Sequence, residues 1–186
     1  MEYKQNGKGE LLIAGVGGWG IVTIGDMLAK AALKEYKNVA WFPSYATMMR
    51  GGDSECCVMF SNERISSPVI YKSLGVMILG AMRIDAFKDR VKPGGLILIE
   101  KTGITEENKV EKDDTDVKYV AAMDTATKLG SIRNANLVML GAYVGATGLI
   151  TKESILNEIS IRFFKKGGDK VVSACKEAFN AGLELV

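Results

Sequence analysis

Short apolar runs recur along the chain, separated by polar or helix-like stretches. Runs of this length are typical of strands that are buried on both faces of a sheet. The pattern predicts six strands, at residues 10–14, 39–42, 55–60, 75–79, 96–99 and 117–121. Helical spacing predicts an alanine-rich helix ending near Tyr36 and further helices at 124–129, 134–145, 152–164 and 169–185. We therefore expect one domain, residues 1–186, folded as a three-layer αβα sandwich with a mostly parallel sheet and a helical C-terminal part.

One strand is expected to run against its neighbours. Residues 55–60 are followed at once by a turn at 61–64, and no helical crossover fits on either side. Because parallel strands need a crossover of a dozen or more residues, this strand, or the short piece 64–66, should be antiparallel. Residues 101–118 are strongly polar, and we expect them to form a solvated loop.

The most informative motif is a glycine cluster after the first strand, Gly15-Val16-Gly17-Gly18-Trp19-Gly20. A side chain at Gly15 or Gly17 would block the turn, while Gly20 would let the helix pack on the strand. The following helix N-terminus would then offer N–H groups to a phosphate. A purely structural tight turn is the alternative. The acidic residue that would hold a ribose at the end of the next strand is missing, since that strand leads into Pro43, which argues against NAD.

A second cluster follows the second strand, where open α/β folds place their ligands. Its candidate binding or interface residues are Ser44, Tyr45, Arg50, Gly51 and Gly52. An arginine beside two glycines combines a planar cation with exposed backbone donors, which suits an anion. A hairpin that turns at the two glycines is the alternative.

Composition excludes several classes of function. The chain has 186 residues with 24 basic and 22 acidic ones, a balance that argues against nucleic acid. No apolar run is long enough to span a membrane, and no hydrophobic signal region follows Met1, so a cytoplasmic protein is expected. Histidine is absent, and the cysteines at 56, 57 and 175 form no CxxC pair. We therefore expect no catalytic residue and no metal or iron–sulfur site on this chain.

Four motifs together resemble a known family. They are the glycine cluster 15–20, the stretch from Pro43 through Arg50-Gly51-Gly52 to Ser54 with Cys56 or Cys57 after it, Lys92-Pro93-Gly94-Gly95 before a strand, and residues 136–141. In this order they look like the gamma subunit of 2-oxoacid:ferredoxin oxidoreductases, which oxidatively decarboxylate pyruvate, 2-oxoglutarate and related acids. The resemblance covers nearly the whole chain.

The resemblance implies a Rossmann-like domain that is inactive alone, structural and coenzyme A-facing. It implies a complex with alpha, beta and ferredoxin-like delta subunits, with ferredoxin as electron acceptor and with thiamine diphosphate, magnesium, iron–sulfur clusters and coenzyme A as cofactors. Thiamine diphosphate would be held mainly by alpha and beta, and this chain would bind no cofactor tightly. A homodimer of the isolated chain stays open as an alternative.

Two departures from the family pattern concern the candidate site. Trp19 stands where the family usually has glutamine, and Met48 replaces the glutamate of a Tyr-Gly-x-Glu-x-Arg-Gly-Gly loop. These changes remove an amide and a carboxylate near the arginine. Two other functions remain open: a stand-alone nucleotide-binding or regulatory module, and a subunit of an indolepyruvate ferredoxin oxidoreductase.

Overall fold

The computed structural model describes residues 7–45 and 53–186. Six strands form one sheet in the order β2-β3-β1-β4-β5-β6. Their bounds are β1 Lys8–Val16, β2 Asn38–Tyr45, β3 Asp53–Ser61, β4 Ser73–Leu79, β5 Val91–Glu100 and β6 Asp116–Val120. Every predicted strand is therefore confirmed, with ends that extend beyond the apolar runs.

The helices follow the predicted order. Their bounds are α1 Ile21–Ala32, α2 Ile84–Phe87, α3 Ala122–Lys128, α4 Ala135–Thr147 and α5 Lys152–Leu183, with short 3-10 helices at Ala81–Arg83 and Ile132–Asn134. The four-residue α2 was not predicted, because one turn carries no helical periodicity. The two predicted C-terminal helices are both present, but they join in α5 through a kink at Gly167 and Gly168.

The expected antiparallel strand is β3, which runs opposite to both β1 and β2. The remaining pairings, of β1 with β4, β4 with β5 and β5 with β6, are parallel. Residues 64–66 form no strand. Only seven residues separate β2 from β3, too few for a crossover helix, so the chain must reverse there.

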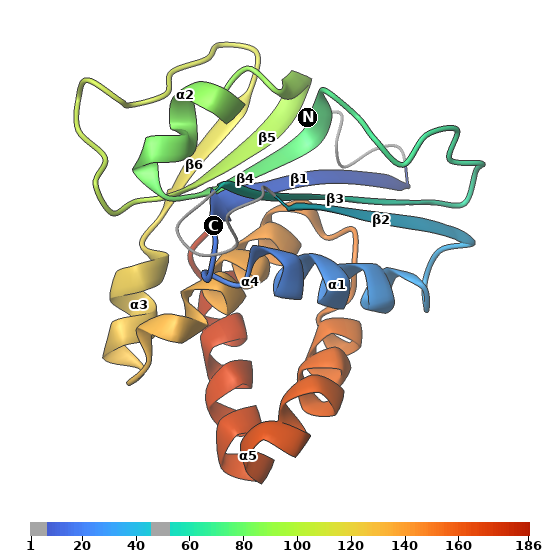
Figure 1. Cartoon of the computed structure of the whole chain (residues 1–186), viewed down its shortest axis with the longest axis vertical. Helices are drawn as coiled ribbons and strands as arrows, with labels where there is room; N and C mark the ends of the chain where they lie inside the picture. The colour runs from blue at the N-terminus through green and yellow to red at the C-terminus, as the bar shows by residue number, and fades with distance from the viewer. Residues whose placement is uncertain (1–6, 46–52) are drawn as a thin grey trace.

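Two hydrophobic cores lie on the two faces of the sheet (Figure 1). The larger core packs α1, α3, α4 and α5 against one face, and the smaller core packs α2 and loop side chains against the other. All seven residues of β4 are buried, as a strand covered on both faces requires. The three-layer arrangement is confirmed, although one outer layer is a single helical turn with loops.

The loop between β5 and β6 is mostly exposed, as its polar composition predicts, but β6 already begins at Asp116. Val110 is buried in the smaller core and Ile104 packs against it. The Tyr119 hydroxyl accepts a hydrogen bond from the Val110 N–H at 2.6 Å. A few apolar anchors therefore attach this solvated loop to the domain.

The C-terminal helices account for most of the larger core. Helix α4 is buried nearly all round, as its apolar sequence predicts, and crosses α5 at very short range. A Cβ at Gly182 would lie 2.0 Å from the Val138 carbonyl oxygen, and one at Gly141 would lie 2.1 Å from the Phe179 carbonyl oxygen. The expected cap of α5 is also present, since the Thr151 side chain accepts from the Ser154 N–H at 3.4 Å. Glycine is therefore needed on both helices where their backbones meet.

Glu35, just after the end of α1, bonds to the start of another helix. Its carboxylate accepts hydrogen bonds from the Thr151 N–H at 3.2 Å and hydroxyl at 2.7 Å. Glu35 therefore joins the end of α1 to the start of α5.

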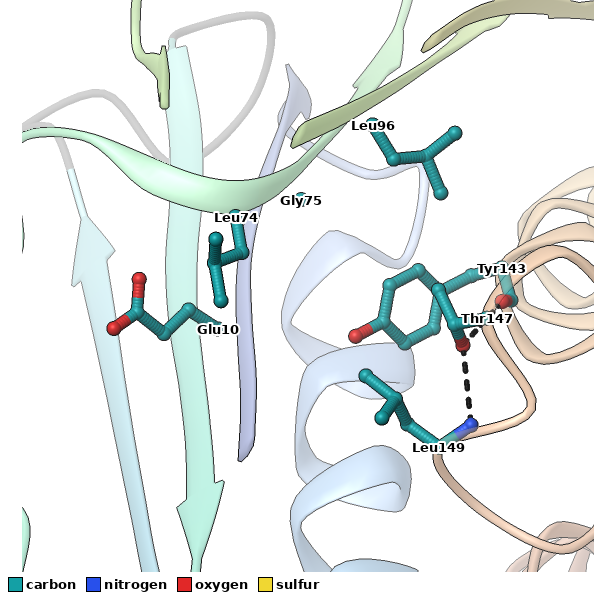
Figure 2. A pocket seen from close by; sticks show the side chains of 7 residues that line it. All are labelled: Glu10, Leu74, Gly75, Leu96, Tyr143, Thr147 and Leu149. Carbon is teal, nitrogen blue, oxygen red and sulfur yellow. Dashed lines mark hydrogen bonds between the residues drawn. The ribbon is translucent and has the colours of Figure 1, made fainter. Parts of the chain in front are cut away.

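Figure 2 shows the amino end of the sheet, where Tyr143 of α4 points toward the strands and Glu10 of β1 points to the other face. The hollow between these residues leaves no room for a water molecule, so it is packed core and no ligand site. Glu10 is buried and forms ion pairs with Lys8 at 2.6 Å and with Lys92. Burial by itself would raise the pKa of Glu10, but hydrogen bonds and charges from the two lysines more than offset it and lower the pKa.

Candidate ligand site at the glycine turn

The sheet brings the glycine turn and the strand ends that flank the second motif to one edge. Because β2 and β1 run in the same direction on either side of β3, their carboxyl ends lie together. Val16 at the end of β1 pairs with Asp53, and Tyr45 at the end of β2 pairs with Ser54. Residues 46–52, which include Arg50, Gly51 and Gly52, lie outside the described residues. These residues are flanked by the end of β2 and the start of β3, and β3 lies directly beside β1, which leads into the glycine turn.

The glycine turn joins β1 to α1 as a tight elbow. The Trp19 N–H donates to the Val16 carbonyl at 3.2 Å. Gly18 and Gly20 have φ angles of 99° and 76°, which side chains rarely adopt. A Cβ at Gly15 would lie 2.9 Å from the Leu79 carbonyl oxygen of β4. Glycine at these positions is therefore explained by backbone geometry before any ligand is considered.

Two parts of the sequence interpretation need correction. Gly17 is not among the glycines with positive φ, so its conformation does not itself demand glycine. Gly20 does not bring the helix against the strand: a Cβ there would lie 2.1 Å from Nδ2 of Asn136, which belongs to α4. That amide donates a hydrogen bond to the Gly20 carbonyl at 3.5 Å. The absence of a side chain at Gly20 therefore leaves space for the Asn136 side chain of α4.

A cavity of about 380 Å³ opens beside this turn. It lies beyond the carboxyl ends of β1, β4 and β5, with Leu79 and Glu100 as the strand residues on its wall. Helices α1, α3 and α4 all begin around it, at Ile21, Ala122 and Ala135. Open α/β sheets place their ligands at this edge, and helix N-termini favour anions. The geometry therefore makes the cavity the candidate ligand site.

Glu100 is the buried polar residue of the cavity wall. Its carboxylate accepts hydrogen bonds from the Thr102 N–H at 2.8 Å, the Thr102 hydroxyl at 3.0 Å and the Met123 N–H at 3.2 Å. The N-cap residue of helix α3 is Ala121, whose side chain cannot form a capping hydrogen bond. Glu100 thus caps α3 from a neighbouring strand and holds that wall in place.

The rest of the wall combines apolar surface with one exposed cation. Trp19, Met123 and Ile132 supply the apolar part, and Arg133 contributes a guanidinium at an exposed position. Such a wall suits a ligand with an apolar or aromatic portion and an anionic group near Arg133. No residue of the described ranges offers a nucleophile with an adjacent histidine, because the chain contains no histidine.

The predicted site residues divide into three groups. Gly18 and Gly20 line the cavity, and Gly15 shapes the elbow beneath it. Ser44 is half-buried on β2, two strands away from β1, and pairs with Glu55, while the Tyr45 backbone ends the same strand. Arg50, Gly51 and Gly52 are not described, so their role stays a prediction.

Sequence reasoning missed the three polar side chains of the cavity wall as site residues. Glu100 carried a usable signal, because a single acidic residue follows the apolar run 96–99 at a strand end. Asn136 was noted only as the start of the motif 136–141. Arg133 had no signal at all, because only the fold brings residue 133 beside the turn at 17–20.

The cysteines do not form a metal centre. Within residues 7–45 and 53–186, no group of three or more His, Cys, Asp or Glu side chains is placed to hold a metal ion. All three cysteines are buried. Burial raises the pKa of the Cys56 thiol to about 12 and raises the pKa values of Cys57 and Cys175. These thiols are structural.

Fold and site together define a domain with a glycine elbow and a ligand cavity at the carboxyl edge of a mixed sheet. The chain belongs to the pyruvate ferredoxin/flavodoxin oxidoreductase family, whose domain matches residues 10–185. A relative, ketoisovalerate oxidoreductase subunit VorA of Methanothermobacter thermautotrophicus, is 35% identical over 174 residues, which cover 92% of this chain and 35% of VorA. The chain thus spans about a third of that relative's length.

Two solved structures agree with this family. The gamma subunit of a keto/oxoacid ferredoxin oxidoreductase from Geobacter sulfurreducens has a TM-score of 0.78 and 25% identity, covering 94% of this chain and 96% of that one. A 2-oxoglutarate:ferredoxin oxidoreductase from Magnetococcus marinus, solved with 2-oxoglutarate, coenzyme A and succinyl-CoA bound, has a TM-score of 0.86 and 25% identity, covering 96% of this chain and 31% of that one. The resemblance noted in the sequence is confirmed. None of the described helices is both long enough and apolar enough to cross a membrane.

Proposed function

We propose that this chain is the gamma-type subunit of a cytoplasmic 2-oxoacid:ferredoxin oxidoreductase and is inactive alone. The observation that carries the proposal is the end-to-end match to a solved gamma subunit, which covers 94% of this chain and 96% of that one. The complex would convert a 2-oxoacid and coenzyme A to acyl-CoA and carbon dioxide, with ferredoxin accepting the electrons. Its other chains would be the alpha, beta and ferredoxin-like delta subunits.

The donor set of this chain supports the division of labour between subunits. An iron–sulfur cluster needs accessible cysteine thiolates at ligand spacing, whereas Cys56, Cys57 and Cys175 are buried thiols with raised pKa values. These residues do not fit a cluster. The proposal therefore assigns iron–sulfur clusters, thiamine diphosphate and magnesium to other chains.

The carboxyl edge of the sheet is the part of this chain that would face coenzyme A. Coenzyme A combines an aromatic base, phosphates and a long polar arm. The cavity offers Trp19 and Ile132 for apolar contact, with Arg133 and three helix N-termini nearby for negative charge. Arg50 follows β2 by five residues in the sequence and lies outside the described residues. We expect it to add a second cation beside the backbone of Gly51 and Gly52.

Co-expression tests the proposal directly. The chain would be produced alone and with its alpha, beta and delta partners, and coenzyme A-dependent reduction of ferredoxin would be assayed with pyruvate, 2-oxoglutarate, 2-oxoisovalerate and indolepyruvate. We expect no turnover and no bound iron with the chain alone, and turnover with one or more acids in the complex. Stoichiometric iron or turnover in the isolated chain would contradict the proposal. Activity confined to indolepyruvate would favour the indolepyruvate enzyme.

The Arg50 series refines the assignment. In the complex, Arg50→Lys keeps the charge but loses the bidentate fork, and Arg50→Ala loses both. If this loop binds coenzyme A, the KM for coenzyme A should rise in the order wild type, lysine, alanine. If it contacts a partner chain, assembly should weaken while the assembled enzyme keeps its kinetics. Unchanged kinetics, cofactor content and assembly would make Arg50 an ordinary surface residue.

The cavity itself favours a second candidate, a stand-alone nucleotide-binding module. A glycine elbow beside a 380 Å³ cavity is what such a module would need. A thermal-shift screen of the isolated chain with NAD, FAD, ATP and coenzyme A separates the two. Stabilisation by NAD, FAD or ATP without assembly into a complex would support the module. Assembly with thiamine diphosphate-binding partners would support the subunit.

A further inference from the structure

Helix α5 is a helical hairpin that projects from the domain on the side away from the sheet (Figure 1). The chain bends at Gly167 and Gly168, whose backbone angles are not helical. Gly168 has φ 61° and ψ −157°, a conformation that is essentially restricted to glycine. The bend is therefore specified by the sequence and separates two arms, 152–166 and 169–183.

The base of the hairpin is firmly attached to the domain. Arg162 forms an ion pair with Asp26 of α1, and Lys34 of α1 forms one with the buried Glu158 at 2.6 Å. Ile155 is fully buried in the larger core. The arm of α5 that carries Ile161 and Phe164 is thus joined to α1 by two ion pairs.

The outer end exposes large apolar side chains. Ile161 is 61% exposed and Phe164 is 57% exposed. Residues three apart lie on the same face of a helix, so these two form one apolar strip. Val171, on the other arm, is also exposed. Two large apolar residues on one face of a projecting helix are an anchor pattern for a groove in a partner protein.

Basic residues surround this apolar strip. Residues 165–170 contain three basic residues and one acidic residue, whereas the whole chain carries a formal net charge of only +2. Lys165, Lys166 and Lys170 are all exposed, and Lys166 lies 5.3 Å from the Phe163 ring centroid. The positive charge of the chain is thus concentrated where the apolar residues emerge. A complementary surface would have an apolar centre and an acidic rim.

We propose that the bend of α5, residues 161–171, docks into an apolar depression rimmed by carboxylates on another subunit of the oxidoreductase complex. The inference rests on the proposed function, since it needs a multi-subunit enzyme. It assigns subunit contact to the bend of α5, none of whose residues lines the candidate ligand cavity. Exposed Ile161 and Phe164 favour a protein partner, because a purely polyanionic one would leave them in water.

Two sets of substitutions test the docking surface in the co-expressed complex. The double variant Ile161→Ser with Phe164→Ser removes the apolar anchor, and Lys165→Glu with Lys166→Glu reverses the charge. Leu33→Ser is the matched control, since Leu33 is 63% exposed at the end of α1. Dissociation constants would be measured for each folded chain and the remaining subunits, and melting of each isolated chain would be recorded by circular dichroism.

We expect the apolar double variant to weaken assembly at least tenfold while it melts like wild type and the control assembles normally. The charge-reversal variant should weaken assembly most at low salt and approach wild type as ionic strength rises. Normal assembly of both variants would overturn the docking surface and leave the proposed function intact. Failure of wild type to assemble would overturn both. Binding of each chain to phosphatidylserine vesicles would also be measured. If the variants lost vesicle binding but assembled normally, the surface would contact a membrane, and the docking proposal would be overturned.

Discussion

Alanine in place of Gly20 would change the cavity wall at a single point. Gly20 caps α1 with φ 76° and ψ 23°, and its missing side chain leaves space for the Asn136 amide of α4. An added Cβ would lie 2.1 Å from Nδ2 of Asn136, far inside van der Waals contact. Asn136 would therefore have to withdraw and lose its bond to the Gly20 carbonyl.

The expected cost has two parts. Placing alanine in a left-handed backbone costs about 1–2 kcal/mol. Losing the Asn136 hydrogen bond, which is long at 3.5 Å, adds about 0.5–1 kcal/mol. The total of about 1.5–3 kcal/mol corresponds to a Tm decrease of about 3–12 °C for a domain of this size. The clash itself is relieved by rotation of the asparagine, because the colliding atom is the end of a side chain.

A double-mutant cycle separates the two parts. Gly20→Ala, Asn136→Ala and the double variant would be unfolded in urea, and the coupling energy compared with that of Gly18→Ala and Asn136→Ala. Gly18 has an equally unusual φ of 99° but open space around it, so it supplies the strain without the contact. We expect coupling of about 1 kcal/mol for Gly20 and none for Gly18. Equal coupling in both cycles, or a Gly20→Ala chain as stable as wild type, would refute this account of the turn.

Three further substitutions probe the scaffold. Glu10→Gln should cost about 2 kcal/mol at pH 7, because a buried carboxylate loses two charge-assisted bonds. Since the folded-state pKa of Glu10 lies below 4.5, the stability difference from wild type, measured by urea unfolding, should shrink as the pH falls below that value. A stability difference that stays constant with pH would contradict this role of the carboxylate. Gly182→Ala should destabilise the chain by about 2 kcal/mol or more despite a helix-propensity gain of about 1 kcal/mol, because the added Cβ meets the backbone of α4. Asn180→Ala, on the exposed face of α5, is the control, and a raised Tm for Gly182→Ala would disprove the close crossing. Gly168→Ala should cost about 1–3 kcal/mol through backbone strain alone, measured by thermal melting, and unchanged stability would show that the bend tolerates a side chain.

The fold could largely be predicted because each buried strand leaves a local trace. The central strand 75–79 is apolar throughout since it is covered on both faces, and β3 had to be antiparallel since its connections are short. Helix α2 left no trace, since it is one turn long. The solvated loop at 101–115 was expected from its composition, but the two residues that anchor it, Val110 and Ile104, left no pattern in the sequence.

The site could be predicted only where it is local in sequence. The glycine elbow was found because its backbone angles need glycine within six consecutive residues. Asn136 and Arg133 reach the same cavity from more than a hundred residues away, and no local pattern places either of them beside the glycine turn. That Asn136 is the neighbour of Gly20 likewise depends on the tertiary fold, which places the start of α4 beside the start of α1.

The burial of all three cysteines has a practical consequence for spectroscopy. The reactive form of cysteine is the thiolate, and burial keeps Cys56, Cys57 and Cys175 protonated and shielded. Maleimide dyes should therefore leave the wild-type chain nearly unlabelled. A single cysteine introduced at Asn180, on the exposed face of α5 and outside the proposed docking surface, would then be the only reactive position among the described residues. A fluorophore there would report directly on the distance between this chain and a labelled partner as the complex forms.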